Sequence, residues 1–229
     1  MSTNTQLEIH SIDCLTNPSL EEQSQCSTVL QDAYVDDRYV AKVCGNSADA
    51  RRLFYETVIE GTTMDCELWV TRVKDESAAG GTTIASVACV SPPGKTPFSD
   101  SPNNNKEEMM ERLTEKIPES VDRWIAKHLN PHYVCAGHFN EDSLFIHALA
   151  TRPEYQRGGS ATALLSRLGE SAKQRGERLG LDTSNASAAK LFEKTGFRDI
   201  HSGALDFEDG GDEVRYRIMS NDSGWTASK

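Results

Sequence analysis

The sequence predicts a mixed α/β (α+β) fold, in which a mostly antiparallel central sheet is flanked by helices on both faces. With 229 residues, 37% of them hydrophobic, the chain can fill one core, and we expect a single domain over residues 1–229. Apolar runs of strand length alternate with runs of helical spacing, which indicates helices packed against a sheet. Successive strands joined by short polar turns favour antiparallel pairing.

The chain up to residue 90 predicts one strand, two helices and a pair of strands. The run 18–22 (Pro-Ser-Leu-Glu-Glu) is typical of a capped helix start, and Ser47 is a second candidate cap. The polar stretch 74–81 is typical of a turn between paired strands. The predicted elements are a strand at 7–15, a helix at 18–33, a helix at 47–59, and strands at 66–73 and 82–90.

Residues 91–134 are predicted to be an insertion ahead of the central strand. The insertion begins with a loop rich in proline and asparagine, and two helical patterns follow at 106–116 and 119–129. Its length exceeds that of ordinary loops, so we expect it to shape a binding pocket or a partner surface. Beyond residue 197 the predicted elements are strands at 199–206 and 213–219 and a frayed polar tail at 220–229.

The stretch from Leu144 to Phe197 organises the rest of the chain. Its apolar run 144–150 has the length of a strand, and a glycine-rich turn at 156–162 then opens a helix. A helix start offers unpaired N–H groups and a positive dipole end, and glycines let an anion approach them. The turn is therefore a candidate pyrophosphate cradle, to which Arg157 adds a charged donor. On spacing alone, a Gly-Gly pair ahead of a helix is more often a plain turn.

Several other classes of function are disfavoured by the sequence. It contains neither G-x-x-x-x-G-K-[ST] nor G-x-G-x-x-G, so nucleotide-driven phosphoryl transfer and dinucleotide binding are not expected. The formal net charge of −11 argues against nucleic-acid binding and favours cationic partners, although solubility alone also explains it. No targeting segment or membrane-length apolar window is present, so we expect a cytoplasmic protein with no membrane partner. A homodimer is left open.

Neither the cysteines nor the histidines predict a disulfide framework or a metal site. The six cysteines are scattered without C-x-x-C pairs, which suits reduced thiols. His128, His132, Cys135 and His138 have a spacing that suggests zinc, but Pro131 interrupts the helix that would align the first two. We therefore expect no metal.

The two motifs around the central joint resemble those of the Gcn5-related N-acetyltransferases (GNAT). The acetyl-CoA loop of that family reads Q/R-x-x-G-x-G/A between a strand and a helix, and Gln156-x-x-Gly159-x-Ala161 fits it. Residues 185–197 resemble the second motif of the family, with Asn185 at its start and a Glu-Lys-x-Gly-Phe ending at Phe197. The order of the two motifs is also that of the family.

The resemblance implies that acetyl-CoA is the cosubstrate. The backbone of residues 149–151 would pair with the pantetheine arm, the loop would hold the pyrophosphate, and Asn185 would help to hold the arm. Residue-level alternatives are that Thr151 only ends a strand and that Asn185 is a helix cap. The implied cosubstrate-binding residues are Leu149, Ala150, Thr151, Gln156, Arg157, Gly158, Gly159, Ser160, Ala161, Thr162, Asn185 and Phe192.

His147 is the candidate catalytic residue. Transfer of an acetyl group to an amine requires a group that takes a proton from the ammonium, and histidine titrates near neutral pH. The run 147–150 (His-Ala-Leu-Ala) is similar to the corresponding strand of the arylalkylamine N-acetyltransferases, in which a histidine takes part in proton removal. Strand alternation predicts Phe145, His147 and Leu149 on one face. The alternative interpretation is a core histidine whose nitrogens are satisfied.

Phe192 is a departure from the family pattern. Many members have a tyrosine at this position, and its hydroxyl can protonate the departing CoA thiolate, whereas phenylalanine has no proton to give. Another donor, water, or an unprotonated thiolate must then serve. The departure also leaves open a non-catalytic protein that binds acyl-CoA.

The predicted function is transfer of acetyl from acetyl-CoA to a primary amine by direct attack in a ternary complex. No cysteine lies in the motifs, so an acetylated enzyme has no evident nucleophile. Tyr34, Asp36 and Tyr39 are the candidate acceptor-binding residues, because the region after the first helix overhangs the acceptor site in similar proteins. A solvated helix end is the alternative for them. A small-molecule amine is the expected acceptor, and a peptide or protein amine is the second interpretation.

Overall fold

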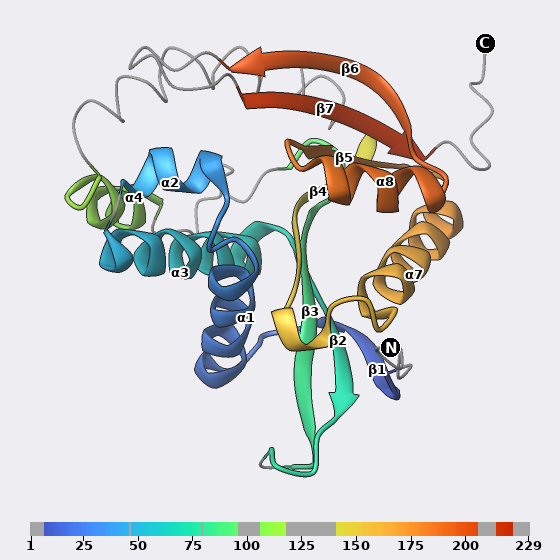
Figure 1. Cartoon of the computed structure of the whole chain (residues 1–229), viewed down its shortest axis with the longest axis horizontal. Coiled ribbons are helices and arrows are strands. Elements are labelled where there is room, and N and C mark those ends of the chain that lie inside the picture. Colours follow the sequence, from blue (N-terminus) through green and yellow to red (C-terminus); the bar gives the residue numbers. More distant parts are fainter. Residues whose placement is uncertain are drawn as a thin grey trace, which may run out of the picture.

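A seven-stranded sheet runs through the molecule. The structure, a computed structural model, describes residues 7–45, 47–78, 80–95, 106–117, 141–205 and 214–221. The strand order is β1-β2-β3-β4-β5-β7-β6, and β4 with β5 is the only parallel pair among these strands. The strands are β1 (Ile9–Leu15), β2 (Glu67–Lys74), β3 (Thr82–Ser91), β4 (Ser143–Thr151), β5 (Arg178–Thr183), β6 (Arg198–Leu205) and β7 (Val214–Asn221) (Figure 1).

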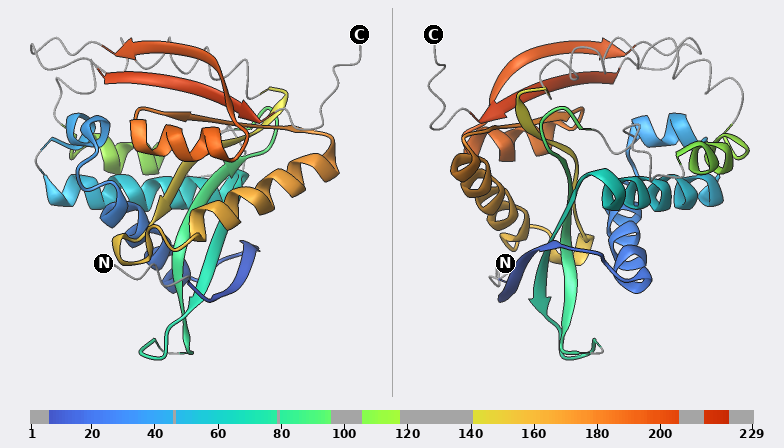
Figure 2. Two further views of the ribbon diagram at one scale, coloured as in Figure 1. Left: turned by 45° about the vertical axis from the view of Figure 1, so that its right-hand side comes forward. Right: turned by 180° about the vertical axis from the view of Figure 1, so that it is seen from behind.

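Helices cover both faces of the sheet, as the sequence predicts. One group packs on one face, which we call the α1 face, and the other group packs on the opposite α7 face, as the front and back views show (Figures 1 and 2). The α1 face carries α1 (Leu20–Ala33), α2 (Arg38–Cys44) and α3 (Ala48–Asp65), with α4 (Lys106–Thr114) beside α3. The α7 face carries α7 (Ser160–Arg175) and α8 (Ala186–Lys194). The mixed, mostly antiparallel sheet with two helical layers confirms the predicted fold class.

Each face of the sheet has its own apolar core. On the α1 face, Val29 and Leu30 of α1 and Ile59 of α3 are fully buried against β2 and β3. On the α7 face, Leu164 and Leu168 of α7 are fully buried and pack with residues of β4 and β5. Burial of a large aliphatic side chain is worth about 1.5–3 kcal/mol. The sheet is thereby held between two helical layers.

Several predicted boundaries differ from the structure. Ser47 caps α3 as predicted, but the helix continues to Asp65 instead of ending at residue 59. Helix α2 was not expected, because residues 32–39 read as the end of a helix. The predicted tail begins too early, since β7 continues to Asn221 and Ser220 is 1% exposed. Parts of the insertion, the helical pattern at 119–129 and residues 222–229 lie outside the described residues.

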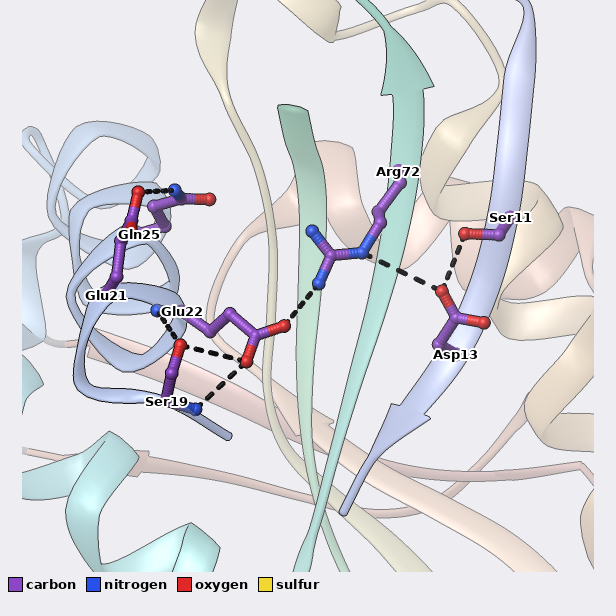
Figure 3. Close-up of polar contacts among 7 residues, drawn as sticks. All are labelled: Ser11, Asp13, Ser19, Glu21, Glu22, Gln25 and Arg72. Carbon is purple, nitrogen blue, oxygen red and sulfur yellow. Dashed lines mark hydrogen bonds and ion pairs between the residues drawn. The ribbon is translucent and has the colours of Figure 1, made fainter. Parts of the chain in front are cut away.

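The start of α1 is fixed to the sheet by a chain of polar contacts. Ser19 and Glu22 form a capping box, in which the Glu22 amide donates to Ser19 Oγ and Glu22 Oε2 accepts from the Ser19 amide at 2.9 Å. Arg72 of β2 donates to Glu22 Oε1 at 2.7 Å and lies 3.8 Å from Asp13 of β1 (Figure 3). Ser11 in turn donates to Asp13. One arginine therefore links α1 to two strands.

No helix in the described ranges combines the length and the apolar character that a membrane crossing requires.

Replacing Glu22 by glutamine is expected to lower the free energy of unfolding by about 1 kcal/mol at pH 7. Hydrogen bonds from Ser19 and the charge of Arg72 lower the pKa of Glu22. The stabilisation that the Glu22 carboxylate contributes is therefore complete above its ordinary pKa of 4.5. It is lost as the pH falls through the lower pKa that Glu22 has in the folded state. Denaturant unfolding of the wild type and the variant at pH 7 and pH 3 measures this difference.

The matched control is Glu21→Gln, because Glu21 is exposed in the same helical turn and accepts only a 3.3 Å bond from Gln25. An equal loss of stability in both variants would show that the bond to Arg72 contributes nothing specific.

Candidate functional site

Strands β4 and β5 part in the middle of the sheet. They pair in parallel only from Ser143 to Ile146 on β4 and from Arg178 to Leu181 on β5. Beyond this point β4 stays paired with β3 as far as Thr151, and β5 stays paired with β7. The inner edges of the two strands therefore separate, and each leaves backbone groups without a partner strand. Such an edge can pair with an extended ligand.

The open edge of β4 presents the backbone of Leu149 and Thr151. Along an antiparallel pair of strands, residues whose backbone bonds to the partner strand alternate with residues whose backbone points away from it. The Arg152 amide donates to the Ala85 carbonyl of β3 at 2.9 Å, so Arg152 is one of the residues that bond to β3. The N–H and C=O groups of Leu149 and Thr151 must therefore point away from β3, into the gap. Ala150 was expected to bind the cosubstrate as well, but its backbone faces β3 and its side chain is buried on the α1 face.

A β-bulge lies at His147. Cys89 of β3 pairs with Ala148, and the next residue, Val90, pairs with Ile146, so His147 has no partner on β3. Ile146 and Leu149 pack on the α7 face, whereas Ala148 packs on the α1 face. The predicted alternation of Phe145, His147 and Leu149 is therefore wrong after His147, because the extra residue reverses the pattern.

The His147 imidazole lies beside the Phe145 ring. Their ring centroids are 4.9 Å apart, which places both rings on the side of the sheet away from α7. His147 Nε2 is buried and has no hydrogen-bond partner among the described residues. This finding disfavours a core histidine with satisfied nitrogens. Burial lowers the pKa of His147 to about 4, so the ring is neutral at pH 7.

Asp182 is a site residue that the sequence did not reveal. It follows Leu181, the last residue of β5 that pairs with β4, and it pairs with Ile218 of β7. Ile218 packs with Phe145, so cross-strand neighbours place Asp182 on the same side as His147. Its carboxylate opposes the lowering of the pKa of His147. The signal that could have found Asp182 was its position directly after the short apolar run Leu179–Leu181.

The glycine-rich turn forms an open helix start, as predicted. Pro153–Tyr155 makes one 3₁₀ turn, and Gly159 then caps α7 with a φ of 93° and no side-chain hydrogen bond. Arg157 is exposed with a φ of 61°. The first amides of α7 are therefore not covered by a side chain of the cap, and a cation lies next to them. This combination suits a phosphate group.

Two hydrogen-bonded contacts fix the turn to the sheet. Ser86 of β3 lies 2.7 Å from both Thr151 and Ser160 through their hydroxyl oxygens, and Ser86 and Ser160 are almost fully buried. The side-chain amide of Gln156 (Nε2) donates to the Thr151 carbonyl at 3.1 Å. Ser160 and Gln156 therefore position the cradle, while Ala161 is partly buried and Thr162 is exposed. Gly158 lies close to the Leu7 side chain.

Helix α8 brings the second motif to the site. Asn185 is its N-cap, and its side-chain oxygen accepts from the amides of Ser187 and Ala188 at 2.8 and 3.1 Å. The alternative reading of Asn185 as a cap is thus correct for this oxygen. Phe192 is 5% exposed, and its ring centroid lies 5.8 Å from that of Phe197.

The three candidate acceptor residues lie in different surroundings. Tyr34, at the C-terminal end of α1, reaches β4, where its hydroxyl donates to the Leu149 carbonyl at 2.9 Å and accepts from the Leu149 amide at 3.3 Å. Asp36 is exposed, and Tyr39 is partly buried against the core of the α1 face. Asp37, which lies in the same stretch and also suits an ammonium, caps α2, and burial raises its pKa.

The histidine cluster at 128–138 lies outside the described residues. Within the described ranges no group of three or more His, Cys, Asp or Glu side chains is arranged to hold a metal ion.

Comparison with known proteins identifies the same family that the motifs indicate. Residues 124–197 match the model of the Acetyltransferase (GNAT) family. No curated protein matches the chain in sequence.

Solved structures resemble the whole chain, at low sequence identity. A histone acetyltransferase HPA2 and related acetyltransferase from Corynebacterium glutamicum has a TM-score of 0.56 at 16% identity, with 92% of this chain and 96% of that one covered. A polyamine N-acetyltransferase from Drosophila melanogaster that forms N-acetylagmatine has a TM-score of 0.55 at 15% identity over 92% and 97%. A mosquito arylalkylamine N-acetyltransferase like 5b has a TM-score of 0.52 at 18% identity over 92% and 99%.

The parted strands and the open start of α7 fall within the part of the chain that the family model matches, and the whole sheet has the fold of these acetyltransferases. Residues 124–197 therefore match the GNAT family of acetyltransferases, and the described structure has the fold of solved acetyltransferases of that kind.

Proposed function

We propose that the protein transfers the acetyl group of acetyl-CoA to the primary amine of a small molecule, by direct attack of the amine in a ternary complex. The observation that carries this proposal is the open edge of β4 beside the start of α7, where the cap residue makes no side-chain hydrogen bond. An extended pantetheine amide needs backbone partners, and a pyrophosphate needs amide donors. The two features lie at opposite ends of one short segment, 149–160.

The residues present fit acetyl-CoA. Leu149 and Thr151 offer backbone groups to the arm, and the turn at 156–162 offers amides and the Arg157 guanidinium to the phosphates. Phe192 supplies an apolar wall beside the thioester. When bound, acetyl-CoA supplies an activated acyl group; the chain has only to orient it, to exclude water and to move protons.

His147 is suited to accept the proton of the attacking amine. Its Nε2 atom is unpartnered, and the ring is neutral at pH 7 because its pKa is near 4. A group with so low a pKa is a weak base, and the Asp182 carboxylate compensates by stabilising the imidazolium. Proton transfer therefore depends on this electrostatic pairing.

Direct attack is favoured over an acetylated cysteine. Cys26 and Cys89 are fully buried in the core of the α1 face, and burial raises the pKa of each thiol to about 12. A thiol that stays protonated is a poor nucleophile. No cysteine lies in the described turn or in α8.

A small cationic amine is the acceptor that the site suits best. Asp37 and Asp182 both lie close enough to Tyr34 to raise its pKa, so two carboxylates lie near the aromatic ring whose hydroxyl contacts Leu149. The Drosophila polyamine and mosquito arylalkylamine acetyltransferases, which share this fold, are named for such amines. A non-catalytic acyl-CoA-binding protein is the second candidate, which the missing hydroxyl at Phe192 favours.

Domain organisation, cellular location and partners are also part of the proposal. We place the activity in a single domain over residues 1–229 and in the cytoplasm, where the five described cysteines, all unpaired, would stay reduced. With a net charge of −11, neither nucleic acid nor a membrane is proposed as a partner. Either a monomer or a homodimer is compatible with these features.

Acetyl-CoA is expected to raise the melting temperature by about 5–10 °C at about 100 times its Kd, because this concentration adds about 2.7 kcal/mol. Release of free CoA thiol in the presence of phenethylamine, agmatine, spermidine or a lysine peptide then reports turnover and ranks the acceptors. A shift without thiol release for any amine would favour the non-catalytic candidate. No shift at saturation would show that the turn does not bind the cosubstrate.

Gly159→Ala is expected to raise the Kd of acetyl-CoA about tenfold. A φ of 93° is strained for alanine by about 1–2 kcal/mol, so relief of the strain rotates the amides of the cradle. Isothermal titration with acetyl-CoA measures the change. Gly169→Ala in the middle of α7 is the control, since its added methyl group meets no atom within 4 Å and the φ restriction does not apply. Equal Kd values of acetyl-CoA for the wild type, Gly159→Ala and Gly169→Ala would show that the turn at 156–162 does not hold the pyrophosphate.

His147→Gln is expected to lower kcat about 100-fold or more while leaving the Kd of acetyl-CoA unchanged, because glutamine does not accept the proton at neutral pH. Initial rates of thiol release measure this loss. Between pH 7 and pH 6 the protonation of His147 should not lower the wild-type kcat, because the pKa of His147 is near 4. His10→Gln, at an exposed position of β1, is the control. Full activity of His147→Gln would remove this residue from the mechanism.

A further inference from the structure

The Tyr34 hydroxyl is bound to both backbone groups that Leu149 presents to the gap. It donates to the carbonyl at 2.9 Å and accepts from the amide at 3.3 Å, across 115 positions of sequence. Leu149 is two residues beyond His147 on the open edge of β4. This edge is where the acyl end of the cosubstrate is proposed to lie. A tyrosine of α1 therefore occupies the reaction centre of the free protein.

The surrounding structure holds the Tyr34 ring in this position. Its ring stacks on Tyr55 of α3 with centroids 6.0 Å apart and an interplanar angle of 16°, and Tyr55 meets Phe54 edge to face at 5.2 Å. The Tyr34 amide donates to the Leu30 carbonyl at 3.0 Å, which joins the residue to the last turn of α1. The other end of α1 is anchored to the sheet through Glu22 and Arg72 (Figure 3). The hydroxyl is thus positioned by packed helices.

The site contains a chemical need that this hydroxyl can meet. Breaking the thioester leaves a thiolate, and Phe192 of α8, which the proposed function places beside the thioester, has no proton to give. Among the described side-chain hydroxyls, that of Tyr34 is bonded to the backbone of Leu149, on the open edge of β4. Burial and the nearby carboxylates of Asp37 and Asp182 raise the pKa of Tyr34, so the hydroxyl keeps its proton and acts as a donor.

We propose, on the basis of the function proposed above, that Tyr34 is the catalytic residue that delivers a proton to the departing CoA thiolate. The hydroxyl that phenylalanine lacks at position 192 is thus supplied from the opposite face of the sheet. In the free protein the hydroxyl is held on Leu149; with acetyl-CoA bound, it turns its proton from the Leu149 carbonyl to the sulfur.

The proton transfers balance. The amine nitrogen attacks the carbonyl carbon, the C–N bond forms and one N–H proton passes to His147. The C–S bond then breaks, its electron pair goes to sulfur, and the Tyr34 proton moves to sulfur to give CoA–SH. The tyrosinate recovers a proton from the imidazolium, directly or through water. Because Tyr34 holds its proton more tightly than a thiol does, the last two transfers must be concerted.

Tyr34→Phe is expected to lower kcat about 10- to 100-fold with a Kd for acetyl-CoA within about threefold of the wild type. Adding Phe192→Tyr to this variant returns a hydroxyl to the thiolate from α8 and should recover most of the loss. Tyr55→Phe is the matched control, because the Tyr55 hydroxyl is buried without a hydrogen-bond partner in the described structure and the stack remains. An unchanged or higher kcat in Tyr34→Phe would show that Tyr34 only blocks the empty edge, which overturns the proposal.

A second measurement needs no acceptor amine. A hydroxyl that donates to the thiolate lowers the pKa of enzyme-bound CoA thiol, so Tyr34→Phe should raise that pKa by about one pH unit. The ultraviolet absorbance of the thiolate across a pH series reports it. If Tyr34→Phe does not fold, 3-fluorotyrosine at position 34 replaces it, and this stronger donor should lower the thiol pKa below the wild-type value.

The outcomes separate the two proposals. An unchanged thiol pKa in a protein that binds CoA overturns the role of Tyr34 and leaves the proposed function intact. If the wild type does not bind CoA, the proposed function fails and the role of Tyr34 fails with it.

Discussion

The bulge at His147 is the constraint on which the site depends. A regular strand would continue to alternate, and Leu149 would then share a face with His147. One extra residue between Ile146 and Ala148 reverses the pattern, so His147 stays on the side of Asp182 while Leu149 packs on the α7 face. The bulge lies where pairing between β4 and β5 ends, at Ile146 and Leu181. The catalytic candidate and the open strand edge therefore arise from the same local irregularity.

Much of the fold follows from local signals in the sequence. The caps at Ser19 and Ser47, the strand runs and the glycine turn at 156–162 each depend on residues close in sequence, and the structure has the corresponding elements. Helix α2 was missed because its seven residues bury only Val40, Val43 and Cys44, too few for a clear helical period. The end of α3 was misplaced because threonines and a glycine near residue 61 weaken helix propensity, and packing overrides that preference.

The site could be predicted only in part, because its sequence motifs describe one side of it. The turn at 156–162 and α8 are continuous segments, so their residue types could be compared with the family motifs directly. By contrast, the bulge depends on register with β3, Asp182 on register with β4 and β7, and the Tyr34 contact on a helix 115 positions away. Such pairings are set by tertiary packing and leave no pattern along the chain. Tyr34 was expected near the acceptor, but its bond to the backbone of β4 was not expected.

The two faces of the sheet divide the chemistry between them. The α7 face supplies a helix start, backbone amides and Arg157, all of which favour negative charge. The other side gathers Asp37 and Asp182 around Tyr34 and His147, which favours positive charge. Screening is weak where groups are buried, so under the proposed function this opposition would orient the anionic cosubstrate and a cationic acceptor toward the same gap from opposite sides. In the proposed reaction the acceptor must lose its charge before it attacks, and the low pKa of His147 leaves the imidazole neutral and able to take that proton.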